Sequence, residues 1–273
     1  KKNGSNFILE GDSFNALKII NNIMNNDTEN SSIFQNLNTK IDIKIKKTYI
    51  DEINYLDNLF GYINFKDNKI NDLKLDSVFP NNKKIKLRVN TNEVFEKTTN
   101  LFTNYPKPLI KRYNFIKGFD GEYLEFNSIK KDNISNSILI IDNFKIQDAP
   151  VFAKLLSLSS LQGIADILTG EGIRFTNFEM KFSSQKGLTT IEEMYAIGPA
   201  VSILMDGYVE AEKLISLRGT LVPATTVNKY IASIPFLGDL LIGDKTGEGI
   251  FGVSFKIKGP PKNLSTTVNP IKT

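Results

Sequence analysis

The amino-acid sequence predicts a mainly β fold with helical inserts (the α+β class), in which an elongated, curved antiparallel β-sheet forms an apolar groove. Segments of alternating apolar and polar residues recur at intervals of roughly ten to fifteen residues, and each is typical of a strand with one buried face. Helical periodicity occurs at only a few places, where we expect amphipathic helices to pack at the groove. This rhythm favours a long sheet over a compact α/β fold.

The composition excludes several functional classes. The chain has 273 residues, a formal net charge of +4, and no cysteine or histidine. Without these residues most transition-metal sites, cysteine nucleophiles and histidine bases are excluded, so we expect no enzyme, no cofactor and no metal site. The lysines are scattered and no basic stripe carries interleaved aromatics, so we expect no nucleic-acid partner.

The first part of the chain, residues 1–117, is predicted to be a β-rich groove segment with short helices. In Thr39–Lys47, isoleucines alternate with charged residues, and the polar run Lys66–Lys69 predicts a hairpin turn. The expected strands are Asn6–Glu10, Thr39–Lys47, Leu59–Phe65, Ile70–Phe79 and Lys84–Val89. The expected helices are Phe14–Met24, with a cap at Asp12 or Ser13, Asn92–Thr103 and Leu109–Ile116.

The second part, residues 118–273, contains longer strands and two helical inserts. Asp148 and Pro150 predict the start of an amphipathic helix over Pro150–Leu168, and glycines end it. A second helix, broken by Pro235 and Gly238, is expected over Thr225–Ile242. The expected strands are Gly121–Phe126, Ser137–Ile146, Ile173–Phe182, Thr189–Ile197, Val201–Val209, Leu214–Leu221 and Ile250–Ile257.

Three motifs suggest catalysis or phosphate binding at first sight, and each has a simpler interpretation. Glu192 and Glu193 are strand neighbours that point to opposite faces, so they do not form an acid–base pair. The run Gly243–Gly249 lacks the spacing of a phosphate loop and is interpreted as a flexible turn. The serines near residue 158 have no base available and are interpreted as small packing residues.

Two blocks of the sequence resemble a known family. The first, Leu214–Pro270, has a strand ending in a Gly-Thr-apolar-apolar-Pro pattern, an asparagine in a short helix, an Ile-Pro-apolar-apolar-Gly turn, a glycine-rich strand and Val-Asn-Pro. Its residues are Gly219, Thr220, Pro223, Asn228, Ile234, Pro235, Gly238, Gly249, Gly252, Val268, Asn269 and Pro270. The second, Ile141–Phe182, combines a strand, an Asp-Ala-Pro helix start, an amphipathic helix and a return strand. Together they resemble the C-terminal region of the bacterial AsmA-like family, in its YhdP-like branch, which is related to TamB.

The resemblance implies a role in the cell envelope of Gram-negative bacteria. It identifies residues 118–273 as an AsmA-like C-terminal module of a periplasmic protein. The family's inner-membrane anchor would precede this chain, which we interpret as a C-terminal fragment. The implied function is phospholipid transport between the inner and outer membranes along a hydrophobic groove, supporting outer-membrane integrity. The alternative is an assembly or scaffold module that binds outer-membrane proteins.

Candidate groove residues follow from the apolar faces of the predicted strands. The expected lipid-binding residues are Phe175, Phe178, Met180, Phe182, Met205, Phe251, Val253 and Phe255. The residues expected to cover the groove from the helices are Leu155, Leu158, Leu161, Tyr230 and Phe236. A simpler interpretation remains open, in which the strand residues pack beneath the helices as ordinary core.

Overall fold

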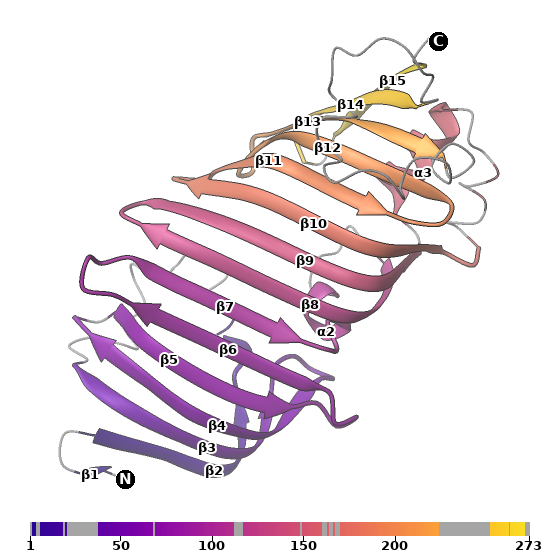
Figure 1. Ribbon diagram of the computed structural model, residues 1–273. Coiled ribbons are helices and arrows are strands. Elements are labelled where there is room, and N and C mark those ends of the chain that lie inside the picture. The colour runs from indigo at the N-terminus through magenta and orange to yellow at the C-terminus, as the bar shows by residue number, and fades with distance from the viewer. Residues whose placement is uncertain are drawn as a thin grey trace, which may run out of the picture. The chain divides into compact units, whose positions relative to one another are not determined.

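The computed structural model describes residues 2–3, 6–18, 20, 38–67, 69–111, 117–147, 149–159, 163, 166, 170–223, 252–261 and 263–270. The described chain is mainly β, with its strands hydrogen-bonded in chain order in one open sheet (Figure 1). The strands are β1 (Lys2–Asn3), β2 (Asn6–Asn15), β3 (Thr39–Tyr49), β4 (Tyr55–Lys66), β5 (Lys69–Val78), β6 (Lys84–Thr91), β7 (Lys97–Thr103), β8 (Lys117–Lys131), β9 (Ile134–Gln147), β10 (Ile173–Gln185), β11 (Leu188–Ile197), β12 (Val201–Glu210), β13 (Leu214–Pro223), β14 (Val253–Gly259) and β15 (Ser265–Pro270). The helices are α2 (Lys107–Ile110) and α3 (Pro150–Leu158).

The sheet is mixed, which corrects the prediction of an antiparallel sheet at one position. Strands β3 to β8 and β9 to β15 pair antiparallel with their neighbours, as predicted. Strands β2 and β3 are parallel, with Phe7 beside Ile41 and Leu9 beside Ile43. The chain between Asn15 and Thr39 is long enough for the crossover that a parallel pair requires.

The chain divides into two compact units. Unit 1 comprises residues 1–108 and 124–132, and unit 2 comprises residues 109–123 and 133–273. Strand β8 contributes its first half to unit 2 and its second half to unit 1.

Unit 1 confirms the predicted strands but not all of the predicted helices. The prediction of a helix over Asn92–Thr103 was wrong, because Lys97–Thr103 forms β7. The Asn92 side chain accepts hydrogen bonds from the backbone N–H groups of Val94 and Glu96, at 3.1 and 2.9 Å, and so closes a turn. Such local side-chain bonding competes with a helix.

The two other short helices expected in the first part are confirmed only in part, since Leu17, Lys18 and Ile20 are helical within the expected span Phe14–Met24. Strand β2 runs on to Asn15, and the Asn15 side chain accepts a hydrogen bond from the Leu17 N–H at 3.0 Å, so Asp12 and Ser13 lie in a strand and not at a cap. The helix expected over Leu109–Ile116 is α2, which ends at Ile110. Residues 21–37 and 112–116 lie outside the described residues.

A small cluster of apolar residues packs together at strand ends of unit 1. Ile50, Leu56 and Phe79 are buried, and Tyr105 packs edge-on against the Phe79 ring at a centroid distance of 5.1 Å. Ile50, Phe79 and Tyr105 follow β3, β5 and β7, and Leu56 is the second residue of β4, so the cluster packs at strand ends of unit 1.

Candidate functional site: the apolar faces of the sheet

Three rows of apolar residues cross the strands of unit 2 on one face. Because directly paired residues point to the same side of a sheet, the strand registers define this face. The first row is Ile141, Phe178, Ala196, Ile203, Leu221 and Val253. The second row is Leu139, Met180, Met194, Met205, Gly219 and Phe255, and the third is Ser137, Phe182, Ile191, Gly207, Leu217 and Ile257. We call these three rows the unit 2 apolar face; Ser137 is its only residue with a polar side chain.

Most of the predicted groove residues lie together on this face. Phe178, Met180, Phe182 and Met205 are half-buried there. Val253 and Phe255 lie on the same face and are buried, each 3% exposed. Phe251 lies outside the described residues, so its placement stays a prediction.

Phe175 joins this face through a kink in the neighbouring strand. Strict alternation along β10 would place Phe175 and Phe178 on opposite sides. Asn143 has a φ of 48°, and the next residue, Phe144, packs against both rings. The Phe144 ring stacks on Phe175 at 5.2 Å between centroids and meets Phe178 edge-on at 6.3 Å. The left-handed residue therefore places Phe175 beside the unit 2 apolar face, although sequence alternation does not predict it.

Helix α3 covers the Phe175 end of this face. The Phe152 ring of α3 lies 6.3 Å from the Phe175 ring, and the helix lies behind the strands in Figure 1. The helix is capped by Ala149 without a side-chain hydrogen bond, and Asp148 lies outside the described residues, so its predicted capping role is not placed.

The leucines predicted on α3 to cover the groove differ in burial. Leu155 is 2% exposed and its neighbour Leu156 is fully buried, whereas Leu158 is 49% exposed. Their role as a groove cover stays a prediction. Leu161, Tyr230 and Phe236 lie outside the described residues.

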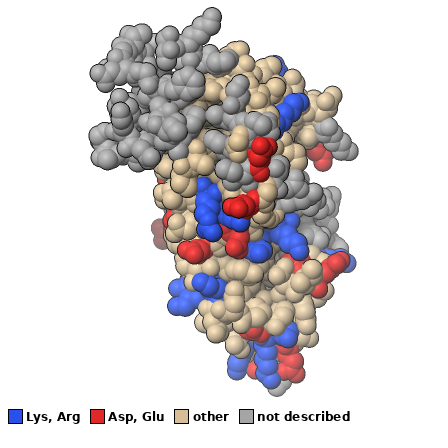
Figure 2. All heavy atoms as spheres, turned by 90° about the vertical axis from the view of Figure 1, so that its right-hand side faces the viewer, with Lys and Arg blue, Asp and Glu red and all other residues tan. Residues whose placement is uncertain are grey.

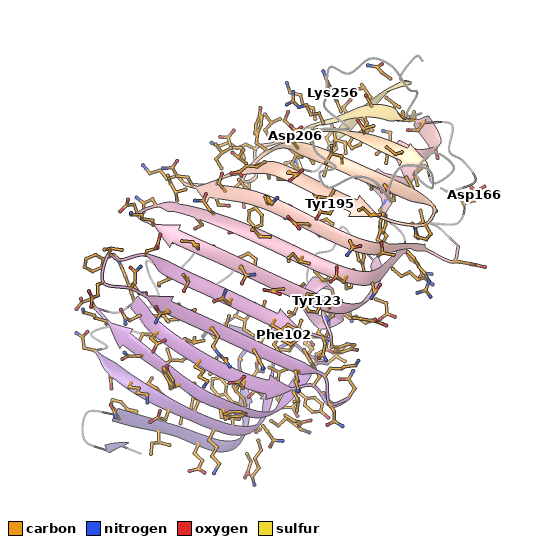
Figure 3. All side chains as sticks on the ribbon, viewed as in Figure 1. Phe102, Tyr123, Asp166, Tyr195, Asp206 and Lys256 are labelled. Carbon is orange, nitrogen blue, oxygen red and sulfur yellow. The ribbon has the colours of Figure 1, made fainter. Side chains whose placement is uncertain are left out.

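The opposite face of unit 2 is polar. Tyr195 donates a hydrogen bond to Glu179 at 2.8 Å, and Lys181 forms ion pairs with Glu179 and Glu193 at 3.3 and 3.2 Å. Burial, the hydrogen bond to Glu179 and the surrounding carboxylates raise the pKa of Tyr195. Figure 3 labels three residues whose registers place them on this face, Tyr195, Asp206 and Lys256.

Unit 1 repeats the same two-faced arrangement. One row is Ile43, Gly61, Leu75, Leu87, Leu101 and Phe126, and the next is Ile41, Ile63, Leu73, Val89, Thr99 and Ser128. We call these two rows the unit 1 apolar face. On its opposite face, Nη2 of Arg88 donates to both carboxylate oxygens of Asp76, at 2.6 and 2.7 Å, and Tyr62 donates a hydrogen bond to Asp72 at 2.8 Å.

The other motifs noted in the sequence form no catalytic arrangement among the described residues. Glu193 pairs with Lys181, and Glu192 is the extra residue of a bulge. The Ser159 hydroxyl donates to the Leu155 carbonyl at 2.7 Å, within its own helix. Across the described ranges, no three acidic, histidine or cysteine residues gather at a metal-binding distance. No helix in those ranges is long and apolar enough to cross a membrane.

Sequence reasoning missed part of the unit 2 apolar face. Ile191 and Met194 are three residues apart in β11, so simple alternation separates them. The register shifts between them by one residue against both neighbouring strands, which returns both side chains to the same face. A bulge of this kind leaves no distinct signal in a single sequence.

The chain was also compared with known proteins. No protein-family model matches it, and no curated protein or solved structure shows significant similarity to it.

Proposed function

We propose that this chain is the C-terminal part of an AsmA-like envelope protein of Gram-negative bacteria, located in the periplasm. In this proposal it is not an enzyme, and the full-length protein is anchored in the inner membrane. The apolar sheet face of each unit forms a groove that holds the acyl chains of phospholipids during transport between the inner and outer membranes. The supporting observation is the set of cross-strand apolar rows, which occupy one face in both units while charged and hydrogen-bonded side chains occupy the other.

Element sizes indicate that α3 by itself covers only part of the unit 2 apolar face. The six strands β9 to β14 span about 24 Å at a strand spacing of roughly 4.8 Å, and β10 alone is about 43 Å long. The nine residues of α3 span about 14 Å. Within the described chain, α3 is therefore too short to cover the unit 2 apolar face, whose Met180, Met194 and Met205 are half-buried.

The energetic role of such a face is passive. Each methylene moved from water onto an apolar surface contributes roughly 0.8 kcal/mol. A continuous apolar face lowers the barrier for a lipid that leaves a membrane, while the headgroup stays in water. Methionine suits this surface because its side chain is unbranched and adapts to irregular hydrocarbon. In this proposal, the direction of lipid transport and its energy supply come from other proteins.

Lipid retention tests this proposal. The protein is purified from cells under mild conditions, and the bound lipid is extracted and measured by mass spectrometry. We expect co-purified acyl lipid, and we expect Met180→Glu on the apolar face to reduce it several-fold. The matched control is Ile138→Glu, which introduces the same charge on the opposite face, where Ile138 pairs with Lys181 and is 38% exposed. Absence of lipid from the wild-type protein, or equal loss in both variants, would contradict the proposal.

A second candidate function, an assembly module that binds outer-membrane proteins, is favoured by one observation. Phe7 and Leu9 on β2 are each 40% exposed, and β1 pairs with β2 only at Asn6 and Phe7. Exposed edges of this kind accept an added strand from a partner. Capture of an outer-membrane barrel protein by the wild-type chain, lost on Leu9→Lys, would support this function.

A further inference from the structure

Two lysines lie side by side where the unit 1 apolar face reaches the hairpin ends. Lys97 begins β7 and pairs directly with Lys130 near the end of β8 (Figure 1). Lys97, Thr99 and Leu101 alternate along β7, so Lys97 is on the same side of the sheet as the apolar rows. Lys97 is half-buried and Lys130 is exposed.

This lysine pair lacks a negative partner in the described part of the chain. Neither residue belongs to any of the ion pairs found there. Burial and the nearby charges of Lys130 and Lys69 lower the pKa of Lys97. On the side of the molecule seen in Figure 2, basic and acidic side chains are interspersed. Like charges placed directly opposite each other destabilise a sheet, so this pair gains from a bound anion.

A hydroxyl without a hydrogen bond lies beside the same pair. Thr91 is the direct partner of Lys97 across β6 and β7. Its Oγ1 atom is buried and has no hydrogen-bond partner among the described residues. A threonine hydroxyl donates readily to a phosphate oxygen, and an unpaired buried hydroxyl costs free energy until it does so.

The residues change from cationic to apolar along β7 and β8. On this face, the next pair inward from Lys97 and Lys130 is Thr99 and Ser128, and the one after that is Leu101 and Phe126. Leu101 lies four residues after Lys97 in β7, so the apolar pair is about 14 Å from the lysine pair. The order of charge, hydroxyl and hydrocarbon matches the order of groups in a phospholipid, from phosphate through glycerol to acyl chain.

We propose that Lys97, Lys130 and Thr91 form a binding site for the phosphate of an acyl lipid whose hydrocarbon lies along the unit 1 apolar face. This inference rests on the proposed function and adds a fixed headgroup position to it. The lipid headgroup is then held where β6 ends, β7 begins and β8 ends, and its chains point along the strands toward Leu101 and Phe126.

Two soluble lipids with the same acyl chains test the site. Affinities of the full chain for monomeric dioctanoyl phosphatidic acid and for dioctanoylglycerol are measured by calorimetry. We expect the phosphate-bearing lipid to bind roughly tenfold more tightly. The double variant Lys97→Gln/Lys130→Gln should abolish this preference while leaving the affinity for dioctanoylglycerol unchanged. Because it removes repulsion between like charges, this variant should also be at least as stable as the wild type.

The control variant removes two lysines from the opposite face of the same unit. Lys74 and Lys86 are exposed, and their registers place them away from the apolar rows, so Lys74→Gln/Lys86→Gln should keep the preference. Equal affinity of the wild type for both lipids, or equal loss in the two double variants, would overturn the headgroup site while leaving the proposed function intact. Binding of inorganic phosphate as tight as that of the phosphatidic acid would indicate a free-anion site and also overturn it. Failure of both lipids to bind would contradict the proposed function as well.

Discussion

The aromatic ring of Phe255 lies over Gly219, its direct partner in the neighbouring strand. A methyl group on Gly219 would lie 2.6 Å from Cζ of Phe255 and 2.2 Å from the backbone oxygen of Leu204. Glycine leaves room for the ring in the middle of the unit 2 apolar face, and Phe255 is buried there at 3% exposure. The Phe255 ring thus occupies the space that a side chain at position 219 would need.

Gly219→Ala should destabilise the protein by about 1–3 kcal/mol, because the added methyl group meets backbone atoms that do not yield easily. The measurement is urea unfolding followed by circular dichroism. Gly163→Ala is the matched control, since a methyl group there meets no atom within 4 Å. We expect the control to be neutral or slightly stabilising. Equal effects of both substitutions would contradict the packing described for Gly219.

Leu156 and Leu158 of α3 should differ strongly in their contribution to stability. Leu156 is fully buried, so Leu156→Ala should cost about 3 kcal/mol through lost burial and the cavity left behind. Leu158 is 49% exposed, so Leu158→Ala should change the free energy of unfolding by less than about 0.5 kcal/mol. Unfolding curves of the two variants check this. If Leu158→Ala destabilised the protein more than Leu156→Ala, Leu158 would belong to the buried helix face that helical periodicity predicts, and this prediction would be contradicted.

The backbone at Asn143 should tolerate glycine and reject valine. Its φ of 48° lies in the left-handed region, where a β-branched residue is strained by about 1–2 kcal/mol. Asn143→Val should therefore destabilise the fold by that amount, and Asn143→Gly should have little effect. Chemical denaturation measures both. If valine were tolerated as well as glycine, the kink that places Phe144 beside Phe175 and Phe178 would not exist.

Tyr195 should make stability depend on pH in alkaline solution. Burial and the hydrogen bond to Glu179 raise its pKa in the folded state. A raised folded pKa favours the protonated form, so its contribution is fully present below the unfolded pKa of roughly 10 and is lost as pH rises through the folded pKa. Tyr195→Phe should therefore make the alkaline decline in stability shallower. Thermal unfolding across this pH range tests the sign, and an unchanged or steeper decline would contradict it.

The sequence predicted the strands well because their faces differ strongly in polarity. Thr39–Lys47 and Ile173–Phe182 lie within β3 and β10 as expected. Phe178, Met180 and Met205 share one face, which follows from alternation combined with pairing between neighbouring strands. The charged residues on the other face, such as Lys181 and Glu193, mark the solvent side equally clearly.

Most of the structural features that the sequence did not predict depend on local backbone geometry. The turn closed by the Asn92 side chain replaced an expected helix with a strand, since apolar spacing alone does not reveal an Asx turn. The kink at Asn143 and the shifted register between Ile191 and Met194 changed which residues share a face. The lysine pair was missed because Lys97 and Lys130 are far apart in the sequence and meet only through the register of β7 and β8.

Photo-crosslinking at matched phenylalanines tests the central claim most directly. Phe182 and Phe126 lie on the two apolar faces, whereas Phe60 lies on the opposite face of unit 1 and is 55% exposed. Each is replaced in turn by benzoylphenylalanine, the protein is irradiated in cells, and attached lipid is identified by mass spectrometry. The account predicts acyl-lipid adducts at positions 182 and 126 and none at position 60. Adducts at position 60 alone, or no lipid adduct at any of the three, would contradict it.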